Sequence, residues 1–191
     1  MVIPYVRRAE PLMLRNIAIL LALGLSGCCH RADQAAWLPE PQRRAEALAG
    51  ARAAVALEST CGGLYECSEA QSRLERVGAS IAACYPTNDP TQDAVPWEFK
   101  LLNSDQPNAF ALPVHRIYLT RGLYERIGGD DALIAAAIAH EMAHLRNRDC
   151  FKPECRFADE SLAREKSADL PAMDHLRRSA YQADSLPRLL R

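Results

Sequence analysis

Three residues that can do chemistry lie within five positions: His140, Glu141 and His144 form the pattern His-Glu-x-x-His. Positions four apart lie on the same face of an α-helix, so the two imidazoles can hold one metal ion between them. Glu141 is rotated to the side, where its carboxylate can take a proton from an attacking water. Since two imidazoles and a nearby carboxylate suit zinc, we expect one Zn²⁺ per chain and Glu141 as the catalytic base.

The run that carries this motif, residues 131–148, is rich in Ala, Leu, Ile and Met, which predicts a helix. Gly128-Gly129 breaks the chain just before it, and Asp130 or Asp131 can cap its first turn. The run is apolar nearly all round before His140, which indicates that the helix is buried. Ionisable groups on a buried helix are costly unless they are paired or bind a metal, so a chance match is disfavoured.

A catalytic zinc usually takes three protein ligands, and a later helix should supply the third. Residues 159–170 have a helical composition in which Glu165 and Asp169 lie four apart on one face. Glu165 can bind the metal, and Asp169 can accept the second N–H of a ligand histidine. On spacing alone, an ordinary solvated acidic face is an equal alternative. The other candidates for the third ligand are Glu160, His115 and His175.

The rest of the chain predicts an α+β fold that is predominantly helical, with the metal helix packed against a small β-sheet or hairpin. Helices are expected over 39–58 and 68–83, separated by a turn at 61–63, and strands over 97–102, 110–112 and 116–120, with a loop over 87–96. Pro113 lies between the last two strands, which indicates an edge strand or a turn. His115 is expected to be an exposed turn histidine.

Three sequence blocks resemble a family of gluzincin zinc metallopeptidases that includes the HtpX heat-shock protease, the mitochondrial Oma protease and the CAAX prenyl endopeptidase. The blocks are residues 108–113 (NAFALP), 138–144 (IAHEMAH) and 165–169 (EKSAD). This resemblance implies a zincin-like fold, Glu165 as the third zinc ligand and Asp169 as its support. It also implies an edge strand along which an extended substrate binds. The residues of that substrate edge are Asn108, Ala109, Phe110, Ala111, Leu112 and Pro113.

The chain departs from the family pattern in three places. Val114-His115 stands where Gly-Gly is usual, so the turn between the strands should differ. Arg148-Asp149 replaces a frequent histidine, which affects none of the proposed ligands. Pro171 should kink or end the helix that carries Glu165. No residue that stabilises an oxyanion can be named; Tyr181 is a guess from its place in the tail, and a packing role is favoured for it.

The N-terminus has the features of a membrane address. Residues 17–25 form an apolar run too short to span a bilayer, and residues 25–28 (LSGC) resemble a bacterial lipobox. We therefore expect a signal peptide over 1–27, a lipidated Cys28, a tether over 28–38 and a single metallopeptidase domain over 39–191. Translation from Met13, a plain signal peptide and an uncleaved anchor are the alternatives. By resemblance to Gram-negative sorting, Cys29 after Cys28 indicates the inner leaflet of the outer membrane, facing the periplasm.

Charge and cysteine usage narrow the possible partners. Residues 1–27 contain three Arg and one Glu, so their removal changes the net charge from −1 to −3, and no basic patch suggests nucleic acid. In an oxidising periplasm the remaining cysteines should form disulfides. Cys150–Cys155 is the first expected pair and Cys61–Cys67 the second, with Cys84 paired to Cys29; a cysteine pair on zinc is the disfavoured rival.

These features together predict a membrane-anchored zinc endopeptidase of the periplasm that hydrolyses unfolded or misassembled proteins, including membrane-associated ones. One competing hypothesis is a non-catalytic lipoprotein chaperone or assembly factor that uses the same groove. A retained Glu141 argues against it, because binding alone requires no general base. A second is a zinc hydrolase acting on a non-peptide amide, which the edge segment disfavours by resemblance.

Overall fold

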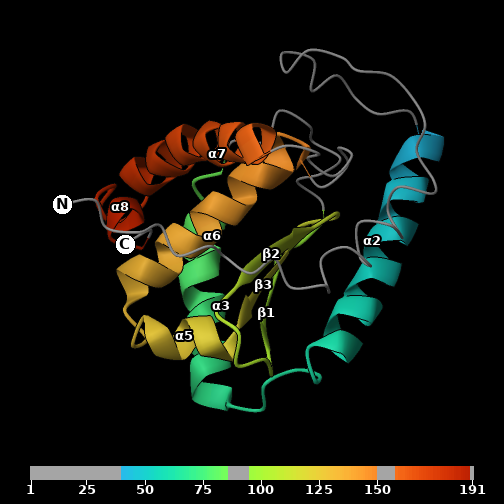
Figure 1. Ribbon diagram of the computed structural model, residues 1–191, viewed down its shortest axis with the longest axis horizontal. Coiled ribbons are helices and arrows are strands. Elements are labelled where there is room, and N and C mark those ends of the chain that lie inside the picture. Colours follow the sequence, from blue (N-terminus) through green and yellow to red (C-terminus); the bar gives the residue numbers. More distant parts are fainter. Residues whose placement is uncertain (1–39, 86–94, 150–157, 190–191) are drawn as a thin grey trace.

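The computed structural model describes residues 40–85, 95–149 and 158–189 (Figure 1). The predicted fold class is confirmed: helices dominate, and the strands form one small mixed sheet. The elements are α2 (Glu40–Thr60), α3 (Ser68–Ala82), β1 (Glu98–Leu102), β2 (Ala109–Leu112), β3 (Arg116–Thr120), α5 (Arg121–Arg126), α6 (Asp131–Arg146), α7 (Ala158–Arg178) and α8 (Ser185–Leu189). Within these ranges, no helix is both long and apolar enough to cross a membrane.

The sheet has the strand order β1-β3-β2, with β1 parallel and β2 antiparallel to the central β3. The outer side of β1 is partly covered, since Tyr65 N–H donates to the Leu101 carbonyl and Leu64 bridges to Leu102. Strand β2 lies at the other end of this order and is an edge strand, one of the two possibilities that the position of Pro113 indicated. Among the described residues, no strand pairs with its outer side.

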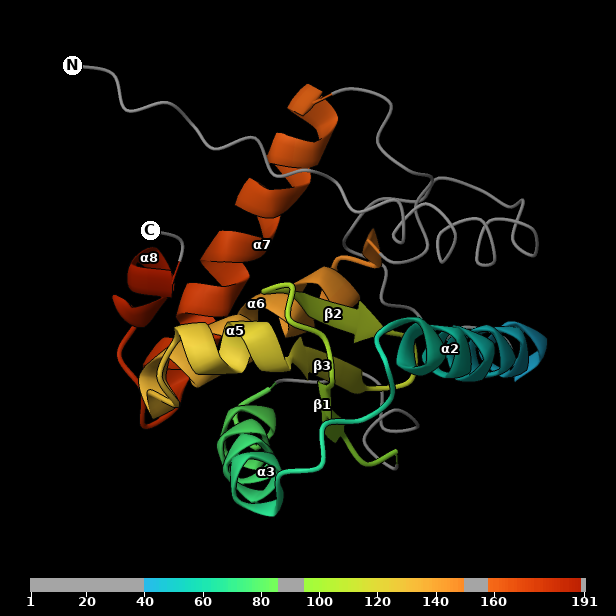
Figure 2. The same ribbon diagram turned by 60° about the horizontal axis from the view of Figure 1, so that its bottom comes forward.

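Side chains of the strands alternate between two cores, because successive residues of a strand point to opposite faces. Ile117 and Leu119 of β3 join the larger core with α3 and α6, whereas Tyr118 joins a smaller core under α2. Figure 2 shows the resulting layers, with α2 on one face of the sheet and α3, α5 and α6 on the other. On β2, the small side chains of Ala109 and Ala111 pack on the α6 side. The edge strand therefore lies beside the helix that carries His-Glu-x-x-His.

The same layering overturns one predicted disulfide. Cys61 and Cys67 are free thiols in this structure. Cys61 is buried in the smaller core, while Cys67 packs against the larger one. The turn between α2 and α3 carries the chain from one face of the sheet to the other, so the two thiols point into different cores. Cys84 is also a free thiol, and its predicted partner Cys29 and the Cys150–Cys155 pair lie outside the described residues.

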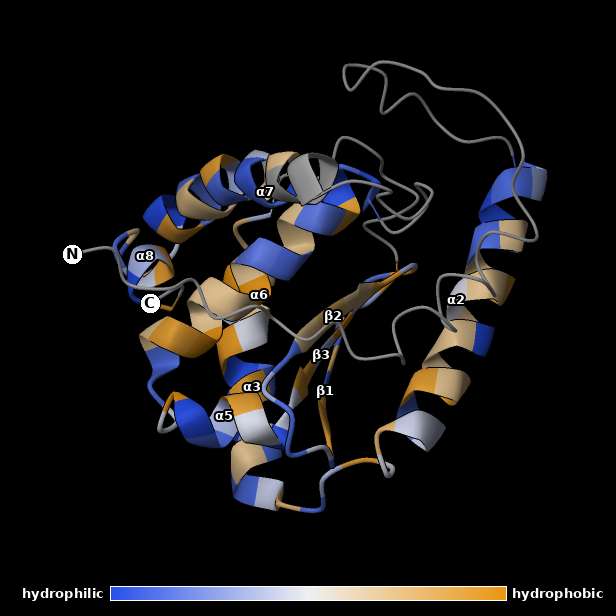
Figure 3. Ribbon diagram, viewed as in Figure 1, coloured by the Kyte–Doolittle hydropathy of each residue, from blue (hydrophilic) through white to orange (hydrophobic). Residues whose placement is uncertain are grey.

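Helix α6 begins where the sequence predicted it and differs from the prediction only at its C-terminal end. The Asp130 carboxylate caps it, accepting hydrogen bonds from the N–H groups of Ala132 and Leu133. Its residues from Ile134 to His140 are all buried. Figure 3 shows hydrophobic colour in its first turns and hydrophilic residues toward its end beneath α7. The helix stops at Arg146, two residues before the predicted end, with Asn147 as its C-cap.

Helix α7 continues past Pro171 to Arg178, so this proline does not end the helix, which was one of the two effects expected of it. A proline inside a helix has no N–H for the carbonyl four residues earlier, which here belongs to Ser167. Asn147 Nδ2 lies 3.1 Å from that carbonyl oxygen and donates to it. A side chain from the end of the neighbouring helix thus replaces the missing backbone donor. This removes the unpaired carbonyl, one of the two reasons for a proline to break a helix, the other being the steric clash of its ring.

The hairpin turn between β2 and β3 also differs from expectation. Val114 and His115 both have positive φ, 63° and 57°, so the turn keeps the left-handed backbone that Gly-Gly would adopt without strain. His115 is not an exposed turn residue: it is 8% exposed, its ring stacks on Trp97 at 4.3 Å, and its Nδ1 lies 3.0 Å from the Val95 carbonyl oxygen. These contacts hold the ring in place at a backbone position that disfavours side chains.

Candidate metal centre

The centre lies where the last turns of α6 face α7. His140 Nε2 is 3.1 Å from His144 Nε2 and 3.2 Å from Glu165 Oε2, and His144 Nε2 is 3.9 Å from Glu165 Oε1. One ligand atom from each of the three residues lies within 4.8 Å of the others. The two histidines come together through the local period of a helix, whereas Glu165 arrives only because α7 packs along α6.

This donor set fits a zinc ion. Two ligand atoms about 2.0–2.2 Å from a tetrahedral zinc lie roughly 3.3–3.6 Å apart, close to the separations of the three side chains here. Two unprotonated imidazole nitrogens in contact repel each other unless a proton or a cation lies between them. His140, His144 and Glu165 would together hold such an ion, and a set of two histidines and one glutamate leaves a position open for water.

The charges of the site are already matched to a cation. Burial lowers the pKa of His144, but hydrogen bonds to Asp149 and Glu165 outweigh it and raise that pKa to about 10. Hydrogen bonds from His140 and His144 hold the pKa of the Glu165 carboxyl far below its ordinary value. The pocket thus keeps a carboxylate ionised and attracts positive charge to its centre.

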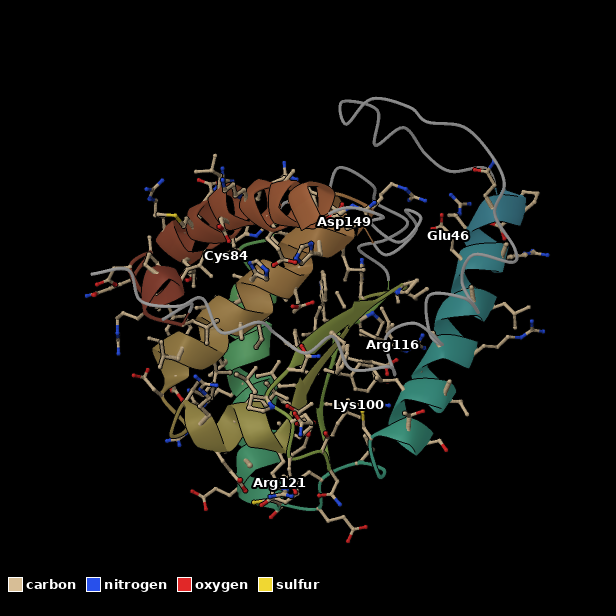
Figure 4. All side chains as sticks on the ribbon, viewed as in Figure 1. Glu46, Cys84, Lys100, Arg116, Arg121 and Asp149 are labelled. Carbon is tan, nitrogen blue, oxygen red and sulfur yellow. The ribbon has the colours of Figure 1, made fainter. Side chains whose placement is uncertain are left out.

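Asp149 is a site residue that the sequence interpretation missed. Its Oδ2 lies 2.9 Å from His144 Nδ1, and its side chain is 8% exposed. Accepting the Nδ1 proton fixes the tautomer that leaves Nε2 free toward the centre. Figure 4 shows Asp149 at the end of α6 that faces α7. The chain turns back there through Arg148, whose φ is 55°, a change of direction that helix spacing does not reveal.

Asp169 lies behind His140, the other histidine of the cluster. Its Oδ1 is 3.3 Å from His140 Nδ1, the position predicted for a support of that histidine. Both atoms are buried without a well-aligned hydrogen bond in the described part of the chain. A small rotation of the carboxylate would complete a bond between them. Each histidine therefore has its own aspartate behind it, Asp169 for His140 and Asp149 for His144.

Glu141 follows His140 on α6 and is half-buried. Its charge acts on His144, whose pKa it helps to raise. The predicted substrate edge lies beside the same helix, since β2 packs against α6. Asn108 anchors the start of this strand: its carbonyl accepts from Thr120 N–H at 3.0 Å, and its own N–H donates to Thr120 Oγ1 at 2.9 Å. The structure thus places Glu141, the residues of the candidate metal cluster and the edge strand on or beside one helix.

The remaining ligand candidates lie elsewhere or outside the description. His115 stacks on Trp97, and His175 packs against Tyr85 with ring centroids 4.8 Å apart. The Glu160 side chain is outside the described part of the chain. Tyr181 packs against the larger core, the role that was favoured for it. Its charged neighbours are Arg76 and Asp131, and Asp131 begins α6, nine residues and roughly 13 Å along the axis before His140.

Comparisons with known proteins find a peptidase family that matches the part of the chain containing His140, Glu141 and His144, and a metalloendopeptidase that is similar to a short segment of the chain. Residues 68–158 match the sequence model of peptidase family M48. The mitochondrial metalloendopeptidase OMA1 of Schizosaccharomyces pombe is similar to this chain, with 40% identity over 48 residues. That alignment covers 25% of this chain and 14% of the OMA1 protein, so the likeness concerns a short segment of the relative.

Proposed function

We propose that this chain is a zinc-dependent endopeptidase of the M48 type with Glu141 as its general base, a proposal supported by the match of residues 68–158 to the sequence model of peptidase family M48 and by the partial similarity to OMA1. The observation that carries the proposal is the cluster of His140, His144 and Glu165, with an aspartate behind each histidine. A site that only stabilised the fold would need no adjacent carboxylate such as Glu141 to act as a base.

The chain's own residues divide the reaction between them. His140, His144 and Glu165 would hold the zinc, which when bound lowers the pKa of water and polarises a peptide carbonyl. Glu141 takes the proton of the attacking water and passes it to the leaving amine. Asp149 and Asp169 keep the two imidazoles oriented toward the centre.

The substrate is proposed to be an extended polypeptide that pairs with the outer edge of β2. The backbone N–H and C=O groups on that side have no strand partner among the described residues, and a peptide in β-conformation can pair with them. Ala109 and Ala111 bring this edge close to α6, so a peptide on it would run past the cluster. This mode favours unfolded or strand-forming polypeptides over folded ones.

The test is the substitution Glu141→Gln, which keeps the side-chain shape and removes the base. We expect cleavage of an unfolded protein such as reduced casein to fall by at least about 100-fold, while one zinc per chain is still bound. Metal content and peptide cleavage are measured on the same preparations. Equal cleavage by wild type and variant would contradict the mechanism. Undiminished protection of a client from aggregation, without cleavage by either form, would favour the chaperone alternative.

We further propose that the enzyme is anchored through a lipidated Cys28 to the periplasmic face of the outer membrane and acts on misassembled proteins there. The lipobox-like end of residues 25–28 supports this, and residues 29–38 would reach at most about 35 Å when extended. In a Cys28→Ala form behind a cleavable signal, cleavage of a membrane-associated client should fall while cleavage of a soluble unfolded protein stays the same. Equal changes for both clients would contradict a role of the anchor in substrate choice.

A further inference from the structure

The hydrogen bond from Asn147 to α7 lies between the residues that build the metal centre. Asn147 is the C-cap of α6 and follows His144 by three positions, so it lies on the same side of that helix. Its acceptor, Ser167, lies midway between Glu165 and Asp169 on α7. This hydrogen bond therefore joins α6 and α7 within one helical turn of His144 on α6 and of Glu165 and Asp169 on α7.

The contact is specific because Pro171 creates its acceptor. Without an N–H at position 171, the Ser167 carbonyl has no helical donor, and Asn147 Nδ2 takes that place at 3.1 Å. The same nitrogen lies 3.3 Å from Ser167 Oγ, whose own proton is donated to the Arg164 carbonyl at 2.7 Å. At any other register of α7 along α6, Asn147 would face a carbonyl that already has a backbone donor.

Register decides the geometry of the centre. A shift of α7 by one residue moves its side chains about 1.5 Å along the axis and turns them by about 100°. Glu165 would then no longer reach His140 and His144, and Asp169 would leave His140. Apolar packing between α6 and α7 is non-directional, whereas the single carbonyl freed by Pro171 offers one directional point of attachment.

We propose that Asn147, acting with Pro171, is a positioning residue that sets the register of α7 on α6 and so aligns Glu165 and Asp169 with the two histidines. This inference rests on the proposed zinc site. The proline and the asparagine act as a pair: the first exposes a carbonyl, and the second donates a hydrogen bond to it. The hydrogen bonds described for the Asn147 side chain go to Ser167 and not to the donor atoms of His140, His144 or Glu165.

A double-mutant cycle on the full-length chain tests the pair. Asn147→Ala should weaken zinc binding about three- to tenfold, the range expected for loss of one hydrogen bond, and lower kcat more than it changes KM. Pro171→Ala restores an N–H for the Ser167 carbonyl, so Asn147 loses its directional acceptor and zinc affinity should fall by a similar factor of about three- to tenfold. In the Pro171→Ala background, Asn147→Ala should cost less than half as much, on a logarithmic scale, as it does alone. Zinc affinity is measured by competition with a chromophoric chelator.

Two controls separate positioning from general destabilisation. Leu170→Ala changes an exposed neighbour of Pro171 and should alter neither zinc affinity nor the coupling. Ser167→Ala keeps the carbonyl acceptor and should also leave affinity nearly unchanged. Thermal unfolding of the metal-free variants reports stability separately. If Asn147→Ala loses equal affinity in the wild-type and Pro171→Ala backgrounds, or loses none while wild type binds zinc, the inference is overturned; if wild type binds no zinc, the proposed function itself fails.

Discussion

Histidines in two regions of the α6–α7 layer are shielded from solvent, but their neighbours give them opposite properties. His140 and His144 each face an aspartate and share Glu165, and the pKa of His144 is raised to about 10. His175 is fully buried against Tyr85 with neither ring nitrogen hydrogen-bonded within the described residues, and burial lowers its pKa to about 4. Burial alone therefore does not mark a functional histidine; carboxylates placed to hold positive charge do.

The largest expected difference between the two regions is in metal binding. His144→Ala removes a proposed ligand and should abolish stoichiometric zinc binding, while His175→Ala, which lies outside the cluster, should keep one zinc per chain. Metal analysis after dialysis against a weak chelator measures both variants. Zinc loss in His175→Ala with the fold intact by circular dichroism would mean that the second region belongs to the site.

The next effect concerns acid stability. The unfolded chain protonates His175 near pH 6.5 and the folded chain only near pH 4, so below pH 6.5 the unfolded state binds more protons and folding stability falls as pH drops. We expect wild type to lose about 3 kcal/mol of unfolding free energy between pH 7 and pH 4 from this group. His175→Phe, which keeps a ring against Tyr85, should lack that part of the loss.

Urea unfolding of both metal-free proteins across this pH range gives the comparison. Other groups, Glu165 among them, titrate in wild type and variant alike, so the difference between the two profiles isolates His175. The opposite sign is expected for His144, whose raised pKa contributes stability below pH 6.5 that is lost as pH rises toward 10 in the metal-free protein. Parallel profiles for wild type and His175→Phe would refute the contrast between the regions.

The smallest expected effect is in the supports of the ligands. Asp149→Asn and Asp169→Asn each keep the size of the side chain and remove the negative charge behind one histidine, so each should weaken zinc binding about 10–100-fold. Chelator competition measures the affinity. Asp174→Asn is a matched control on α7 near His175, and it should leave zinc affinity unchanged. An Asp149 variant that binds like the control would remove this residue from the site.

Residues close in sequence could be assigned because their geometry follows from local periods. The spacing of His140 and His144 sets one face of a helix, and the sequence predicted strands over 97–102 and 116–120, which the structure has as Glu98–Leu102 and Arg116–Thr120. Helical spacing singled out Glu165 and Asp169, the resemblance to metallopeptidases favoured them, and the fold brings both beside the histidines. Their roles as ligand and support stay predictions until zinc binding is measured.

Tertiary packing decided the features that the helix and strand periods of the sequence do not reveal. Asp149 reaches His144 because Arg148 turns the chain back after α6, and Cys61 and Cys67 stay apart because a sheet separates them. Pro171 was expected to disturb α7, yet a donor from another helix, Asn147, occupies the place of its missing N–H. Each of these outcomes depends on a change in chain direction or on how separate elements pack, and residue propensity and helix period do not contain that information.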